Sequence, residues 1–458
     1  MAATAFWPTP SHPSVFVERR RRLRQRLSAP ALLAAGWARP KNFPNNPYPF
    51  RAESHFLFLV GRHIEGAALV LTPDSERLYA PAPDPEDALW HGPSPALEDL
   101  GRELGLDVRP LEELGPVPGL AMLPPQDGDS AAWLSELFDR DVEPGGGDRL
   151  EGPDADLADA MIALRLYHDA AGVAQLRQAA EVTAAAFSAA WAATRPGIRE
   201  ASVRAAMEAA IIARGMRDAY EPIVTVRGDV LHNHHHDKLL QAGDLLLADV
   251  GAETPEGYAA DVTRTWPVSG RFSPSQRAIY DLVLEAQRAA IAAVRPGVRF
   301  LEVHRIAGRT LLGGLIDLGV FRGRLDELYE RGAAALLFPH GVGHLLGLDV
   351  HDMEDLGDRA GYAPGRERPA AFGDRYLRLD RDLAPGMVVT IEPGLYFIDA
   401  LLQAPSEVGD LESALDRERL SAFSDVRGIR IEDDVLVTAT GAEVLTGAIP
   451  KAAEALER

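Results

Sequence analysis

The pattern of hydrophobic and polar positions changes near residue 155. This change divides the chain into two parts. Up to about residue 155, short apolar runs alternate with stretches of helical spacing, beginning with a helix over 14–27. The apolar runs predict strands over 31–35, 56–60, 67–71 and 77–80. From residue 157 to 193 the chain is Ala-rich with apolar positions at helical spacing, which predicts one long helix. We therefore expect an α/β fold with an N-terminal domain at 1–155 and a C-terminal domain at 156–458.

Two predicted strands of the C-terminal part, 245–251 and 258–266, each carry an acidic residue among apolar neighbours. These residues are Asp249 and Asp261. A buried carboxylate costs several kcal/mol unless it is paired or bound to a metal, and two carboxylates on adjacent strands repel each other. A shared cation explains both acids. On the strand pair alone, the alternative that one acid caps a turn and the other pairs with Arg264 stays open.

The C-terminal part also contains an internal repeat. The segment TRPGIR at 194–199 recurs as VRPGVR at 294–299, and each follows one predicted helix and precedes another. In the same order, AGDLLLAD at 242–249 matches PGMVVTIE at 385–392. A duplicated unit would bring Asp249 and Glu392 to equivalent positions about a pseudo-twofold axis. A further strand at 428–435 carries Glu432 and, two positions earlier on the same face, Arg430.

Histidines gather in two places near these acids. The block HGVGHLLGLDVH at 340–351 holds three imidazoles and three glycines, which makes a poor core strand. Glycine lets backbone approach a site closely, and imidazole suits first-row metals and acid–base chemistry. The run HNHHHD at 232–237 lies just before the acid-bearing strands, so part of it can reach the site, while most of 234–236 is expected to be solvated loop.

The charge and cysteine content of the chain exclude several classes of binding partner and metal site. With 47 Lys and Arg against 68 Asp and Glu, the net charge of −21 argues against nucleic acid or an anionic membrane, and the basic run at 19–26 is expected to be the solvated face of a helix. The absence of cysteine excludes disulfides and thiolate metal sites. We expect no secretory signal at the N-terminus and no membrane span, and therefore a cytoplasmic protein.

Taken together, these residues resemble the pita-bread metallopeptidases, and within them the proline-specific branch of Xaa-Pro dipeptidase (prolidase) and aminopeptidase P. The resemblance implies a creatinase-like N-terminal domain followed by a pita-bread domain. It implies two divalent metal ions, with Mn²⁺ as the first expectation and Co²⁺, Zn²⁺ or Fe²⁺ as alternatives. The implied ligands are Asp249, Asp261, His344, Glu392 and Glu432.

The same resemblance implies the remaining site residues. Glu392 matches the acid that also serves as general base, and Arg430 matches the family's site arginine. Three histidines match groups that face the substrate or stabilise the tetrahedral intermediate: His232, His340 and His351.

Short segments of the sequence resemble either prolidase or aminopeptidase P. Segment 376–387 resembles the prolidase segment whose arginine, here Arg378, binds the free carboxylate of a dipeptide, and 394–402 and the insert before Gly428 also look like prolidases. The expected function is therefore hydrolysis of the Xaa-Pro bond in dipeptides. Segments 51–56 and 61–71 resemble aminopeptidase P, so removal of the N-terminal residue from longer Xaa-Pro peptides is the alternative.

Two other classes are disfavoured because the full ligand set is present: a non-catalytic pita-bread module that binds peptides, and a metal-independent creatinase-type amidinohydrolase. The expected partners are a peptide with proline at its second position and, by resemblance only, a second copy in a homodimer.

Overall fold

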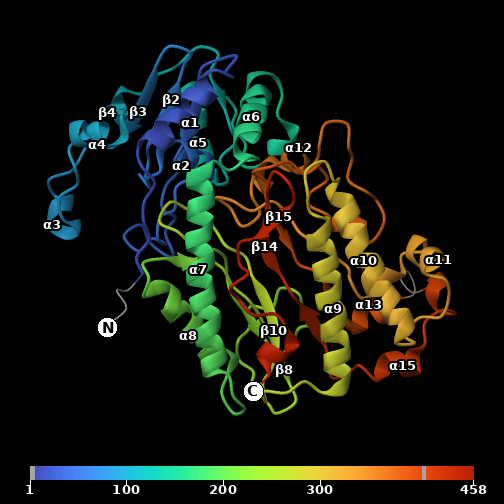
Figure 1. Ribbon diagram of the computed structural model, residues 1–458. Coiled ribbons are helices and arrows are strands. Elements are labelled where there is room, and N and C mark those ends of the chain that lie inside the picture. The colour runs from blue at the N-terminus through green and yellow to red at the C-terminus, as the bar shows by residue number, and fades with distance from the viewer. Residues whose placement is uncertain (1–5, 405–408, 458) are drawn as a thin grey trace. The chain divides into compact units, whose positions relative to one another are not determined.

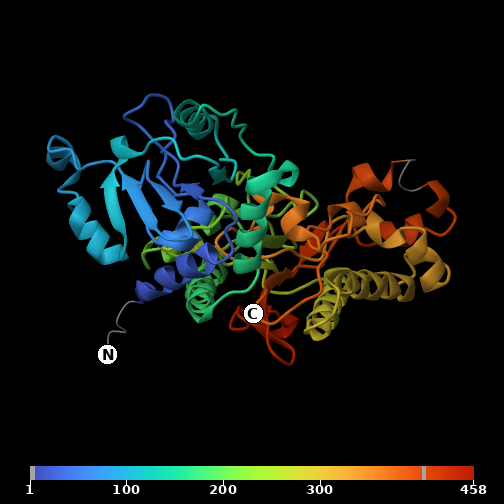
Figure 2. The same cartoon turned by 90° about the horizontal axis from the view of Figure 1, so that it is seen from above.

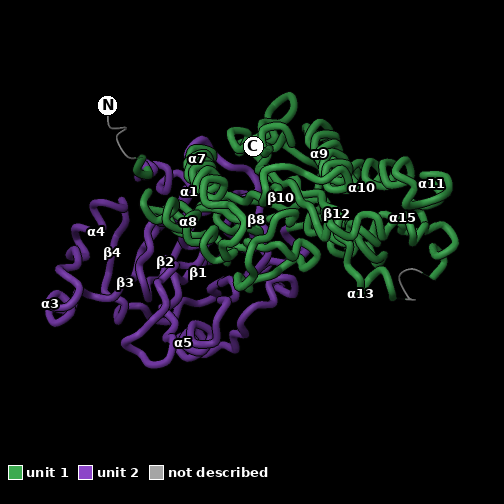
Figure 3. Tube along the Cα trace, turned by 90° about the horizontal axis from the view of Figure 1, so that it is seen from below, with its two compact units in different colours: residues 1–8, 172–352, 361–458 green, residues 9–171, 353–360 purple. Residues whose placement is uncertain are grey.

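The computed structural model describes residues 6–404 and 409–457, which fall into the two units coloured in Figure 3. Unit 1 comprises residues 1–8, 172–352 and 361–458, and unit 2 comprises residues 9–171 and 353–360. The first residues of the N-terminus expected to lack a signal, 1–5, and residues 405–408 of the insert before Gly428 lie outside the described residues. The domain boundary expected between residues 155 and 156 stays a prediction.

Unit 2 is built on a five-stranded sheet of order β4-β3-β2-β1-β5. Figures 2 and 3 show this sheet between helices α1 (Ser14–Arg24) and α5 (Gly128–Phe138). Its core contains Leu32, Val70, Met122 and, from α5, Leu134. The strands are β1 (Ala31–Ala34), β2 (Ala68–Leu71), β3 (Glu76–Ala80), β4 (Asp107–Pro110) and β5 (Ala121–Met122). The other helices of this unit are α2 (Ser54–Val60), α3 (Asp87–His91), α4 (Leu97–Leu104) and α6 (Gly152–Arg165).

The strand predicted at 56–60 is wrong, because this segment forms helix α2. Its residues are buried on all sides, so the continuous apolar run carried no helical period. Helix signals do flank the run. The Glu53 side chain accepts a hydrogen bond from the Phe56 N–H, and Gly61 ends the helix with a φ of 72°.

The basic run on α1 also differs from the expectation of a fully solvated face. Arg19 is 2% exposed and Arg20 is 0% exposed. Arg19 pairs with Asp169 at 2.9 Å, and Arg20 pairs with Glu76 and donates to the carbonyl oxygens of Leu59 and Leu104. These two guanidinium groups therefore hold unit 2 together, while Arg21 and Arg26 remain exposed.

The helix predicted over 157–193 is divided in the structure. Helix α6 ends at Arg165, and α7 (Ala170–Ala193) begins after a short turn. Asp169 in that turn accepts two hydrogen bonds from Arg19, which accounts for a polar residue fixed between two helices.

The internal repeat is confirmed by the fold of unit 1. Helices α7 and α8 (Glu200–Ile212) are joined by the first Arg-Pro-Gly turn, and α9 (Pro274–Ala293) and α10 (Phe300–Asp317) by the second (Figure 1). Gly197 and Gly297 both have left-handed φ values, 88° and 82°. Their N–H groups donate to equivalent carbonyl oxygens, those of Leu240 and Leu383.

Each half of the repeat also supplies an antiparallel strand pair. The first half has β8 (Leu245–Asp249) and β10 (Thr263–Pro267), with β7 (Ile223–Thr225) beside β8. The second has β11 (Val388–Ile391) and β14 (Asp433–Val437), with β15 (Ala442–Val444) beside β14. Two short pairs complete the strands: β6 (Arg217–Asp218) with β9 (Ala252–Glu253), and β12 (Gly394–Tyr396) with β13 (Gly428–Arg430). The remaining short helices are α11 (Leu325–Glu330), α12 (Asp358–Gly361), α13 (Asp399–Leu402), α15 (Arg417–Ser421) and α16 (Ala453–Leu456).

The strand predicted at 258–266 begins only at Thr263. The segment before it passes very close to the backbone at Gly251. A Cβ at position 251 would lie 1.7 Å from the Ala260 carbonyl oxygen. Glycine is therefore required at 251, and the acid at 261 lies on irregular backbone just ahead of the strand.

No helix among the described residues combines the length and the apolar character needed to cross a bilayer.

Candidate active site

Four acidic residues meet in unit 1 because each lies at or next to the end of a buried strand. Asp249 is the last residue of β8, and Glu392 follows β11 at the equivalent place in the second half. Asp261 lies two residues before β10, and Glu432 lies directly before β14. Asp249, Asp261 and Glu432 are buried, at 9%, 5% and 2% exposure. Strand ends thus direct the acids from both halves into one place.

His344 completes this group. Its backbone carbonyl accepts from the Thr390 N–H of β11, and its ring Nδ1 lies 2.9 Å from the Leu345 carbonyl oxygen. Since a carbonyl only accepts, Nδ1 carries the proton and Nε2 of the neutral ring carries a lone pair. Nε2 lies 3.4 Å from Asp261 Oδ2 and 3.7 Å from Glu392 Oε1. One ligand atom each from Asp261, His344 and Glu432 lie within 4.8 Å of one another.

The electrostatics of this group call for a cation. Burial raises the pKa of Asp249 and Asp261, raises that of Glu392 to about 8, and raises that of Glu432 well above its usual value. Burial also lowers the pKa of His344 to about 4, which keeps its ring neutral. The lone pair of a neutral imidazole therefore faces the carboxyl oxygens of Asp261 and Glu392. The oxygen and nitrogen donors suit a divalent first-row metal, so the residues fit the expected ions.

Arg430 of β13 lies inside this cluster, as the site arginine was expected to. Its Nη2 is 2.5 Å from Asp249 Oδ2, its Nε donates to Thr263 Oγ1, and its Nη1 donates to the Tyr396 hydroxyl. A fixed cation therefore neutralises part of the acidic charge beside Asp249.

The other predicted residues surround the acids. His340 Nδ1 lies 2.8 Å from the Gly341 carbonyl and 3.8 Å from Glu392 Oε2, and its Nε2 lies 2.9 Å from the Tyr396 hydroxyl. The His351 ring lies edge-on to the His344 ring, with centroids 4.3 Å apart. Burial lowers the pKa of both His340 and His351 to about 3.

Two further predicted residues, His232 and Arg378, interact electrostatically with charged groups of this cluster. His232 is on the loop between β7 and β8, where partial burial and the positive charge of Arg430 lower its pKa. Arg378 is half-buried, and burial lowers its pKa although the negative charge of Glu392 opposes that shift.

Known protein families and relatives match most of this chain. Residues 174–439 match the model of metallopeptidase family M24, and residues 16–120 match the aminopeptidase P N-terminal domain. A probable Xaa-Pro aminopeptidase of Talaromyces stipitatus is 36% identical over 426 residues, which cover 89% of this chain and 87% of the relative. The chain belongs to metallopeptidase family M24.

Other proteins similar to this M24 peptidase bear related names. A probable Xaa-Pro aminopeptidase of Aspergillus fumigatus is 34% identical over 90% of this chain and 88% of the relative. Among solved structures, aminopeptidase PepP of Pseudomonas aeruginosa matches with a TM-score of 0.79 and 29% identity over 98% of this chain and 97% of that one. Escherichia coli aminopeptidase P with the inhibitor Pro-Leu gives the same score and identity, over 98% of both chains. The expected creatinase-like domain followed by a pita-bread domain is thereby confirmed.

Several side chains of the M24 site carried no usable signal in the sequence. The Tyr220 hydroxyl lies 2.6 Å from both Asp249 Oδ1 and Asp261 Oδ1, but a single tyrosine before the strands stands out in no pattern. Thr263 donates to Glu432 Oε2 at 2.6 Å. Tyr396 joins His340 to Arg430, and it did lie within the stretch 394–402 that resembled the family.

A second cluster of similar composition lies in unit 2. It consists of Glu53, His55 and Asp355. His55 Nε2 lies 3.0 Å from Asp355 Oδ2, and Arg165 Nη1 donates to His55 Nδ1 at 3.0 Å. Because Asp355 is 300 positions from His55, no local pattern could join them. The buried guanidinium already supplies the positive charge here.

Proposed function

We propose that this M24 peptidase is an Xaa-Pro aminopeptidase, which removes the N-terminal residue from peptides with proline in the second position. The observation that carries the proposal is the convergence of Asp249, Asp261, His344, Glu392 and Glu432, in a chain that matches relatives named Xaa-Pro aminopeptidase along nearly its whole length. These relatives favour the alternative over prolidase, which was the main expectation. The prolidase-like segment around Arg378 was too short to decide between two branches that share their ligands.

When bound, divalent ions at these ligands lower the pKa of water and polarise a carbonyl oxygen, which is the chemistry that amide hydrolysis needs. We assign the binding of two ions to the four acids and the imidazole named above. Arg430 and Tyr220 keep the Asp249 carboxylate in place, since each contacts one of its oxygens.

The proton-handling residues are Glu392 and the neighbouring histidines. Glu392 lies between His344 and His340, at 3.7 and 3.8 Å, so its carboxylate can accept a proton from attacking water. His340 is oriented by Gly341 and Tyr396, and His351 packs on His344. We assign to His232, His340 and His351 the positioning of the scissile carbonyl and stabilisation of the negative charge that develops on it.

Selection of proline must rest on shape, because the Xaa-Pro bond has no N–H to recognise. A dipeptide offers a free carboxylate directly after proline, which a half-buried arginine such as Arg378 could clamp. A longer peptide has no charge at that position. In an aminopeptidase, Arg378 is therefore dispensable for hydrolysis.

A substrate panel with added Mn²⁺ tests this proposal. We expect kcat/KM for Ala-Pro-Ala to exceed that for Ala-Pro, and Arg378→Ala to leave hydrolysis of Ala-Pro-Ala within a few-fold of wild type. Arg375→Ala is the matched control, since Arg375 lies three positions before Arg378, is exposed and stacks on Tyr376. Preferred cleavage of Ala-Pro, with its selective loss in Arg378→Ala, would restore the prolidase hypothesis.

Manganese as the native metal, a homodimer and a cytoplasmic location stay predictions. Metal analysis of the purified protein, light scattering and cell fractionation check them in turn.

A further inference from the structure

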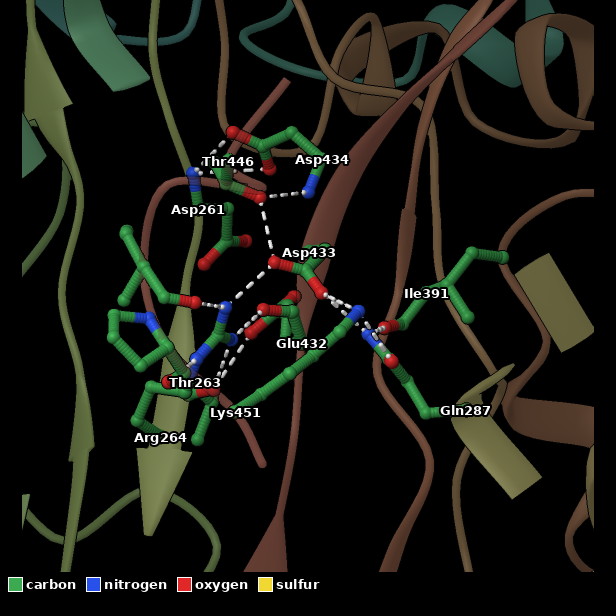
Figure 4. Close-up of polar contacts among 12 residues, drawn as sticks. Asp261, Thr263, Arg264, Gln287, Ile391, Glu432, Asp433, Asp434, Thr446 and Lys451 are labelled. Atoms are coloured by element: carbon green, nitrogen blue, oxygen red, sulfur yellow. Dashed lines mark hydrogen bonds and ion pairs between the residues drawn. The ribbon is translucent and has the colours of Figure 1, made fainter. Parts of the chain in front are cut away.

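Three consecutive acids, Glu432, Asp433 and Asp434, lie at the start of β14, and only the first is expected to bind metal. Successive side chains of an extended chain point to opposite faces. Glu432 therefore faces the metal-ligand candidates, whereas Asp433 points away from them, toward Arg264 of the neighbouring strand β10 (Figure 4). Both Asp433 and Arg264 are 0% exposed.

Arg264 uses all five of its N–H groups. Nη1 donates to the backbone carbonyls of Thr263 and Glu432, at 3.0 and 2.5 Å, and Nη2 donates to Asp433 Oδ1 at 2.7 Å. The remaining donors reach the carbonyls of Ile449 and Pro450, at 2.9 and 3.0 Å. One guanidinium thus fixes the backbone at Thr263 and Glu432, which lie on the strands that carry the metal-ligand candidates.

Asp433 is equally complete as an acceptor. Its Oδ1 accepts from Arg264 and from the Thr446 hydroxyl at 2.8 Å, and its Oδ2 accepts from Gln287 Nε2 at 2.7 Å and Lys451 Nζ at 2.5 Å. A buried polar network in which every group is satisfied is rigid and sets a single geometry. Arg264 and Lys451 carry two positive charges and Asp433 carries one negative charge, so these three side chains have a net charge of +1. They lie behind the four acidic metal-ligand candidates.

The network reaches the backbone beside two further ligands. The Thr446 hydroxyl accepts from the Asp434 N–H at 3.1 Å, and the Asp434 carboxylate lies 3.3 Å from the Asp261 N–H. Gln287 Nε2 is 3.5 Å from the carbonyl of Ile391, the residue before Glu392. Figure 4 shows these contacts converging from different elements on the strand ends.

We propose that Arg264, Asp433, Lys451 and Thr446 are positioning residues that set Glu432, Asp261 and Glu392 at metal-binding distance before any ion arrives. The inference rests on the proposed metal ligands. None of the four contacts the ion itself in this proposal; they act through backbone and through Asp434. Partners of metal ligands typically contribute 10–100-fold in metal affinity.

Paired substitutions in the full-length protein, stripped of metal by a chelator, test the proposal. Thr446→Val keeps the shape but removes the hydroxyl, and Thr446→Ser restores it; Lys451→Met and Lys451→Arg form a second pair. Thr194→Val is the matched control, because Thr194 is a buried threonine whose hydroxyl accepts from Trp266 of β10 and not from a residue of this network. Mn²⁺ binding is measured by titration calorimetry, beside the melting temperature of each metal-free variant.

We expect Thr446→Val and Lys451→Met to bind Mn²⁺ 10–100-fold more weakly than wild type, with Thr446→Ser and Lys451→Arg close to wild type. Thr194→Val should lower the melting temperature and leave Mn²⁺ affinity unchanged. A fall in melting temperature without any change in affinity in both Thr446→Val and Lys451→Met would overturn the inference. If Lys451→Met does not fold, the Mn²⁺ affinity of Thr446→Val alone decides whether the inference holds. Absence of Mn²⁺ binding in the wild type would instead overturn the proposed function.

Discussion

Two clusters of the same composition, two carboxylates and one imidazole, occur in the two units and differ in what balances them. In unit 2, Glu53 caps helix α2, and His55 is held between Asp355 and the guanidinium of Arg165. In unit 1, the Nε2 lone pair of His344 faces oxygens of Asp261 and Glu392. The first cluster is complete as a structural ion-pair group, whereas the second holds like charges that a cation must bring together.

This difference shows that residue type alone does not define a metal site. In both places, ligand atoms of two acids and one histidine lie within 4.8 Å of one another. The deciding features are the tautomer of the imidazole, fixed in unit 1 by the Leu345 carbonyl, and the presence or absence of a buried arginine on the ring.

The largest effect is expected from removing the unit 1 imidazole. His344→Ala should reduce hydrolysis of Ala-Pro-Ala to background and lower the amount of bound Mn²⁺, because one ligand is lost and the remaining acids repel each other. Metal content by atomic emission and single-turnover assays measure both. If His344→Ala kept near-wild-type turnover and full metal content, the unit 1 cluster would not differ from the unit 2 cluster in the way described.

A smaller effect is expected at Tyr220, whose hydroxyl contacts Asp249 and Asp261 together. Tyr220→Phe keeps the ring but leaves both carboxylates without this donor, and we expect a 10–100-fold loss in Mn²⁺ affinity. Calorimetric titration of the metal-free protein measures the loss. Tyr362→Phe is the control, because its buried hydroxyl donates to the Leu377 carbonyl instead of to a metal-ligand candidate. Equal affinities in Tyr220→Phe and wild type would contradict the expected role.

The smallest effect on metal is expected in unit 2. Arg165→Met removes the cation from the His55 cluster and should destabilise the fold by about 3 kcal/mol, because Arg165 is buried and its partners lose their counter-charge. Mn²⁺ affinity and hydrolysis in the folded fraction should stay at wild-type values. Denaturant titration and calorimetry measure the two quantities. A second Mn²⁺ site that appears or disappears in Arg165→Met would show that the unit 2 cluster also binds metal.

The sequence predicted the core of the site because strand periodicity and repeat symmetry are local signals. Asp249 and Glu392 end matched apolar segments, and the Arg-Pro-Gly turns recur at equivalent helix junctions. Fold class followed from the same pattern. Segment 56–60 was mispredicted because a helix buried on every side shows the same continuous apolar run as a buried strand.

What the sequence could not reveal depends on contacts between distant positions. Tyr220, Arg264 and Arg165 are single polar residues in ordinary contexts, and their partners lie tens to hundreds of positions away. The burial of Arg19 and Arg20 was hidden for the same reason, since a helix with six arginines over 19–26 looks solvated until its neighbours are known.

The division of the metal-ligand candidates between the two halves of the repeat has a consequence for biogenesis. Asp249 and Asp261 come from the first half, while His344, Glu392 and Glu432 come from the second. A nascent chain that has emerged only as far as α9 offers two carboxylates and cannot capture an ion tightly. With the proposed ligands, metal binding would require both halves to be synthesised and packed together, and the proposed peptidase activity would arise only then.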